Sequence, residues 1–186
     1  MSLIKNLLLI LFFGCFENAT SQPLEGTIPW KEGVFLSWND FKAKPPQNSN
    51  FKANTNAGIS FSWGLRKENG NENLSYEVKS FFFPELSWVV AGAKTDHLLQ
   101  HEQTHFDITE LYVRKFRKGL SEFVLKGSYE NVHEILNDLY NLIEKERSLM
   151  QKEYDQQTNH SLNKEADIKW QKLVRKELFK LRNFRN

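Results

Sequence analysis

The segment 94–117 reads KTDHLLQHEQTHFDITELYVRKFR and contains neither glycine nor proline, which predicts a long α-helix. At its centre is the pattern HExxH, formed by His101, Glu102 and His105. Residues four apart lie one above the other on a helix, so both imidazoles can reach one metal ion. Glu102 lies beside the first histidine, where a carboxylate can take a proton from water activated by the metal. The pattern is typical of a zinc hydrolase site.

The composition fits one globular domain. The chain has 186 residues, a formal net charge of +2 and 40% hydrophobic residues, enough for a core of its own. A charge near neutrality, without a long run of lysine and arginine, gives no reason to expect nucleic acid as a partner.

The first 21 residues have the pattern of a signal peptide. Lys5 supplies the positive charge, an apolar run covers 7–16, and small residues precede a cleavage point between Ser21 and Gln22. The run is too short for a stable membrane span, so we expect a secreted or periplasmic protein. The alternative is a lipoprotein anchored through Cys15, which is the only cysteine, so the mature chain has no internal disulfide.

Residues 22–90 have the pattern of strands. Apolar residues alternate with polar ones in 59–63 and again in 74–78, and a turn-rich segment at 67–73 with an Asn-Gly pair separates the two stretches. This predicts an antiparallel hairpin joined by that loop. A shorter strand is expected at Val34-Phe35-Leu36, before the chain is broken by Pro45-Pro46.

Residues 91–186 have the pattern of helices. The first should run roughly from Lys94 to Gly119, the second should begin near Tyr129, and the third should cover about Lys164 to Leu181. The predicted class is α+β, in one domain spanning 22–186: a small N-terminal antiparallel sheet, then three C-terminal helices with a zincin-like metal helix first. The apolar stripes of the last two helices are expected at Val132, Ile135, Leu136, Leu139, Leu142, Ile143 and Met150, and at Ile168, Leu173, Val174, Leu178 and Leu181.

A catalytic zinc ion takes three protein ligands, so a third must come from another part of the chain. The candidates lie between the second and third helices, because two antiparallel helices return the chain toward its start. His160 leads, since neutral imidazole is a preferred zinc ligand. Asp155 is the alternative, either as a ligand or as the acceptor that orients a ligating histidine. The hydroxyl of Tyr154 could donate to a developing oxyanion.

His97 forms a ladder with His101 and His105 at intervals of four residues. On a straight helix the first and last of these lie about 12 Å apart along the axis, too far to share one metal ion. We therefore expect His97 to line a cleft or to be an ordinary polar position.

Several separated motifs resemble a bacterial family of unknown function described as predicted secreted zinc-dependent proteases. The motifs are LLQHEQTHFDITELY at 98–112, LSWNDFK at 36–42, SWV at 87–89 and YDQQTNH at 154–160, followed at a distance by Gln171. The resemblance covers most of the chain after residue 21. It implies His101 and His105 as metal ligands, Glu102 as catalytic base, and His160 or Asp155 as the group completing the site. Ser161 stands where the family has glycine.

These patterns predict a zinc-dependent hydrolase, most simply a peptidase that acts on a peptide or protein substrate with Glu102 as general base. One rival is an exported zinc-binding structural or interaction protein without turnover. Another rival is a helical interaction module that binds no metal. This hypothesis is based on the apolar stripes of the second and third helices.

Overall fold

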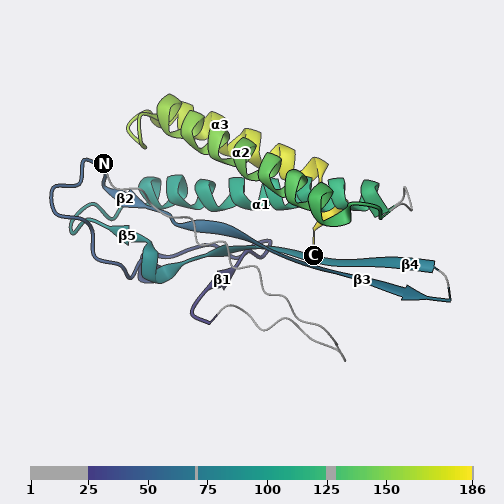
Figure 1. Ribbon diagram of the computed structural model, residues 1–186. Coiled ribbons are helices and arrows are strands. Elements are labelled where there is room, and N and C mark those ends of the chain that lie inside the picture. The colour runs from purple at the N-terminus through teal and green to yellow at the C-terminus, as the bar shows by residue number, and fades with distance from the viewer. Residues whose placement is uncertain (1–24, 70, 125–128, 186) are drawn as a thin grey trace.

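The computed structural model describes residues 25–69, 71–124 and 129–185. It confirms the α+β class, with small antiparallel sheets in the N-terminal half and three helices after them (Figure 1). The strands are β1 (Ile28–Pro29), β2 (Ala53–Asn54), β3 (Ala57–Glu68), β4 (Asn71–Phe82) and β5 (Trp88–Val89). The helices are α1 (Asp96–Val124), α2 (Val132–Thr158) and α3 (Lys164–Lys180), with the 3-10 turns η1 (Trp38–Asp40), η2 (Pro84–Leu86) and η3 (Arg182–Phe184).

The predicted hairpin is present as β3 and β4, and β1 pairs with the other edge of β4. The pairing places Phe61 opposite Val78, which sets the apolar residues of both strands on the face that packs on the helices. The connection is shorter than expected, because pairing continues to Glu68 opposite Asn71. Asn69 has φ near +50°, the left-handed conformation that tight hairpin turns require.

The prediction of a strand at Val34-Phe35-Leu36 is wrong, because these residues have no strand conformation in the structure. Val34 and Phe35 are exposed, whereas Leu36 is buried and its N–H donates to Oε1 of Gln103 on α1, at 2.8 Å. A side-chain amide on the helix therefore replaces the sheet partner that an apolar triplet would otherwise need. The second small sheet is formed instead by β2 and β5.

Helix α1 lies between the sheet and the α2–α3 pair (Figure 1), and it contacts β3, β4, α2 and α3. Because it is covered from both sides, most of its residues are buried, including a set of polar and charged ones. It continues past Gly119, where a Cβ atom would come within 3.2 Å of Leu139 on α2. That glycine allows the two helices to approach closely and does not end the helix.

The buried faces of α2 and α3 differ from the expected stripes. Leu136 and Ile143 on α2 and Val174 and Leu178 on α3 are buried as predicted, but the side chains of Ile135, Leu142, Ile168 and Leu173 are at least 40% exposed. On α3 the buried residues are Asp167, Trp170, Val174 and Leu178. The helix is thus rotated so that a carboxylate replaces Ile168 on the inner face.

The expected signal peptide, its cleavage point and Cys15 lie outside the described residues. Among the helices of the described part, none is both long enough and apolar enough to cross a membrane.

Candidate metal site

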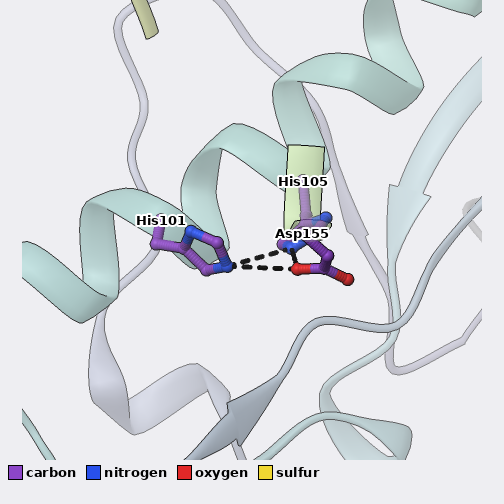
Figure 2. Close-up of side chains that lie close together, drawn as sticks. All are labelled: His101, His105 and Asp155. Atoms are coloured by element: carbon purple, nitrogen blue, oxygen red, sulfur yellow. Dashed lines mark hydrogen bonds and ion pairs between the residues drawn. The ribbon is translucent and has the colours of Figure 1, made fainter. Parts of the chain in front are cut away.

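Three potential metal ligands meet where α1 faces α2 (Figure 2). His101 and His105 lie one turn apart on α1, and their Nε2 atoms are 3.3 Å from each other. Oδ1 of Asp155, from α2, lies 3.4 Å from Nε2 of His101 and 3.1 Å from Nε2 of His105. The structure therefore brings together the two histidines of the predicted motif and one of the two candidates for a third ligand.

Each histidine ring is held in position by a hydrogen bond that its Nδ1 atom donates. Nδ1 of His101 donates to Oδ1 of Asp167 on α3, at 2.9 Å. Nδ1 of His105 donates to Oε1 of Gln151 on α2. The Gln151 amide nitrogen donates to the carbonyl oxygen of His105, so its oxygen is the atom that faces the ring and must accept.

With a hydrogen on each Nδ1, the neutral rings have lone pairs on both Nε2 atoms. Three acceptors, two imidazole nitrogens and the Oδ1 atom of Asp155, then point at one another within hydrogen-bond distance. Such a cluster is stable only if a cation lies among the three atoms, either a proton or a metal ion. Histidines oriented by a carboxylate or amide behind them are the usual arrangement around protein-bound zinc.

The charges around the site favour a cation. Burial alone would lower the pKa of His101, but the surrounding carboxylates, Asp155 first among them, raise it to about 9. Burial would raise the pKa of Asp155, but hydrogen bonds from His101 and His105 hold it well below its usual range. The same balance lowers the pKa of Asp167.

Glu102 is 3% exposed, and its Oε2 atom is buried without a hydrogen-bond partner among the described residues. Its backbone oxygen accepts a hydrogen bond from Oγ1 of Thr55, which ties this turn of α1 to the segment after β2. A buried carboxylate oxygen without a protein partner is costly, unless a water molecule or a substrate group occupies the space next to it.

Tyr154 lies next to His101 and Asp167. Its side chain is fully buried, its ring stacks on His101 at a centroid distance of 4.6 Å, and its hydroxyl donates to Asp167 at 2.6 Å. Burial and Asp167 raise its pKa, so the hydroxyl keeps its proton. The hydroxyl lies behind His101, on the Nδ1 side, and its contacts orient Asp167. The oxyanion role predicted for this hydroxyl stays a prediction.

His160 lies at the solvent side of the site. Its side chain is 44% exposed, its Nδ1 atom is 3.4 Å from Oδ1 of Asp155, and its ring packs on Phe51. It belongs to a turn in which Asn159, His160 and Ser161 all have positive φ. Asp155 is therefore the residue in direct contact with both α1 histidines, and His160 contacts Asp155 from outside.

Two residues support this arrangement in ways that the sequence did not reveal. Asp167 and Gln151 orient the two histidines, and neither was predicted. Oδ2 of Asp167 also lies 3.1 Å from Nε2 of His97, so His97 contacts the carboxylate that orients His101. The expectation that His97 lines a cleft or is an ordinary polar position stays a prediction. Asp167 is an acidic residue on the buried, mainly apolar face of α3. This signal could be recognised only after the structure had shown which face of α3 is buried.

A family model described as a bacterial protein of unknown function (DUF922) matches residues 86–161. The matched segment contains α1 and α2, and with them His101, His105, Asp155 and His160, but it ends before Asp167. No curated protein and no solved structure matches the chain.

Proposed function

We propose that the protein is a zinc-dependent hydrolase, most simply a peptidase. The observation that carries this proposal is the meeting of three acceptor atoms, from His101, His105 and Asp155, with both ring hydrogens directed away from the meeting point. Two imidazoles and one carboxylate form a ligand set that catalytic zinc sites use, and it leaves a coordination position open.

Zinc held by these residues supplies Lewis acidity, which makes water more acidic and polarises a carbonyl group. The protein supplies the rest. Glu102 would accept a proton at its buried Oε2 atom and return it to the leaving amine. Asp167 and Gln151 would hold the rings of His101 and His105 in position, so that neither turns as the charge in the site changes.

The proposal of a peptide substrate rests on the family resemblance and on a sheet edge near the site. In the described residues β2 pairs only with β5, and the segment that follows β2 contacts α1 at Glu102. An extended peptide could add to this edge through main-chain hydrogen bonds. The groove of about 860 Å³ between α1, α2 and α3 is lined by none of the three ligands, so it does not bear on this choice.

The proposed place of action is outside the cytoplasm, either secreted or periplasmic, because residues 1–21 have the composition of a signal peptide. Lipid attachment at Cys15 is the alternative.

The variant Glu102→Gln tests the enzymatic proposal. We expect cleavage of peptide, amide or ester substrates to fall by about 10²–10⁴-fold, while one equivalent of zinc stays bound. Glu153→Gln, an exposed residue on α2, is the matched control and should keep full activity. Equal activity of the two variants would contradict the assigned role of Glu102.

One observation favours a second candidate, a zinc-binding structural protein without turnover. His160 lies close enough to Asp155 that a small movement could make it a fourth ligand, and four protein ligands close a zinc site. If His160→Ala loses zinc as fully as Asp155→Ala does, and no substrate library is cleaved, this second function is the correct one.

A further inference from the structure

A second cluster of buried charges lies on the side of α1 that faces β4, away from the metal ligands. Glu110, Arg114 and Arg117 are each less than 9% exposed. The carboxylate of Glu110 accepts from Nε of Arg114 at 2.9 Å and from Nη1 of Arg117 at 3.3 Å, and also from the hydroxyl of Ser80. One carboxylate is thus shared by two guanidinium groups.

The two arginines differ in how many of their guanidinium nitrogens have a hydrogen-bond partner. All three nitrogens of Arg117 donate, to the carbonyl oxygens of Val78 and Phe184 and to Glu110. In Arg114, Nε donates to Glu110 and Nη1 to the carbonyl oxygen of Leu178, but Nη2 is buried without a partner among the described residues. Leaving a charged donor buried and unpaired is costly, so we expect a group other than the described residues to pair with it.

Arg114 lines a cavity of about 360 Å³ between β1, the end of β4 and α1. Five of the lining side chains are basic and two, Glu32 and Glu110, are acidic. Each of these acids already pairs with an arginine, Glu32 with Arg185 at 3.0 Å and Glu110 with Arg114. The indole of Trp30 lies over the guanidinium of Arg114, with its ring centroid 5.1 Å from Cζ. Two further carboxylates lie next to the lining: Glu77 pairs with Lys79 at 2.6 Å, and Asp107 accepts from the indole N–H of Trp30 at 2.8 Å. The lining itself has more basic than acidic side chains and an aromatic wall.

We propose that this cavity binds a small organic oxyanion through its carboxylate or phosphate group, with Nη2 of Arg114 as the main donor. Arginine is suited to both groups because its nitrogens form charge-assisted hydrogen bonds to paired oxygens. The volume is within the range of small-molecule sites and exceeds what a bare anion needs, so the remainder of the ligand would lie along Trp30. Zinc binding and hydrolysis do not require this site.

The first experiment titrates inorganic phosphate and acetate into metal-free protein, with chloride at equal ionic strength as reference. Metal removal matters because both probes also coordinate zinc. The readout is the indole N–H resonance of Trp30, and the other four tryptophans serve as internal references. We expect a saturable shift at Trp30 with at least one probe. Saturation by phosphate alone assigns a phosphate ligand, and saturation by acetate alone assigns a carboxylate. No saturable shift with either probe overturns the proposal.

Variants test which side chain binds. Arg114→Lys keeps the charge but loses the Nη2 donor, and should weaken anion binding about tenfold. Lys31 lies at the exposed rim of the cavity, so Lys31→Gln should weaken anion binding about two- to threefold without affecting the fold. This variant replaces Arg114→Lys in the test if Arg114→Lys does not fold. Lys172→Gln, exposed on α3 and outside the cavity, is the charge-matched control and should have no effect. Equal effects of Lys31→Gln and Lys172→Gln would overturn the proposal, because binding would then follow net charge alone. Zinc content should be the same in all these proteins.

Discussion

At the scale of single residues, Asp167 supports the proposed metal site through its contact with His101. Its Oδ1 atom accepts from Nδ1 of His101 and from the Tyr154 hydroxyl, and its Oδ2 atom lies 3.1 Å from His97. These contacts fix both the tautomer and the orientation of His101. A fully buried carboxylate that accepts a hydrogen bond from a ring N–H increases the basicity of that imidazole.

The variant Asp167→Asn should therefore lower zinc affinity by about 10–100-fold while leaving the stoichiometry at one. Competition with a chromogenic chelator measures this. Asp138→Asn, which removes an exposed charge on α2, should bind zinc as the wild type does. Equal affinities for both variants would show that the Asp167 carboxylate does not act on the site.

The pH dependence of stability follows from His101 and Asp155. In metal-free protein the pKa of His101 is raised from 6.5 to about 9, so its charged form stabilises the fold fully below pH 6.5, and this contribution disappears as the pH rises through 9. The pKa of Asp155 is lowered, so its contribution is present above about pH 4 and is lost on acidification.

Zinc competes with the same proton, so its binding should strengthen between pH 6.5 and 9, where the metal-free protein loses stability. Melting temperatures measured across this range with and without zinc should diverge as the pH rises. Parallel curves would mean that zinc does not replace a proton on this cluster.

At the scale of the elements, the turn between α2 and α3 determines where His160 lies. Asn159, His160 and Ser161 have φ values of 48°, 51° and 70°, a conformation that costs free energy for residues other than glycine. The carbonyl oxygen of Ser161 lies 3.0 Å from Nε2 of His97, which ties the turn to α1. The chain maintains this strained turn next to the candidate metal site.

Ser161→Gly should raise the free energy of unfolding by about 0.5–1 kcal/mol, because glycine adopts positive φ without steric cost. Chemical denaturation measures this, with Ser161→Ala as the control that removes the hydroxyl but keeps the strain. Zinc affinity should not fall. A less stable glycine variant would indicate that the Ser161 side chain contributes more than its backbone strain costs.

The elements also show why the sequence predicted part of the site and missed the rest. His101 and His105 were predictable because the spacing that aligns them is local to one helix. The contact of Asp155 with them depends on how α2 packs on α1, across 50 residues, so the sequence left Asp155 and His160 as alternatives. Asp167 was missed because the expected stripe of α3 passed through Ile168 and Leu173, whereas the observed packing places Trp170 inside.

At the scale of the whole molecule, α1 is the central layer, with the sheet on one side and α2 and α3 on the other (Figure 1). Its two sides carry different buried polar groups: the proposed metal ligands toward α2 and α3, and the Glu110, Arg114 and Arg117 cluster toward β4. Zinc would connect α1 to α2 through Asp155, so metal binding should stabilise the packing of these helices.

Zinc at about 100 times its dissociation constant should therefore stabilise the fold by roughly 2.7 kcal/mol, which corresponds to a rise in melting temperature of about 5–10 °C. Calorimetry before and after adding a chelator measures this change. An unchanged melting temperature would mean that zinc does not bind preferentially to the folded protein.

The measurement that tests the central claim most directly is the zinc content of the protein after equilibrium dialysis, for the wild type and for the double variant His101→Ala, His105→Ala. We predict one equivalent of zinc in the wild type and none in the double variant, with Asp155→Ala losing more zinc than His160→Ala. Equal zinc content in the wild type and the double variant, whether one equivalent or none, would contradict the claim that these histidines form a metal site.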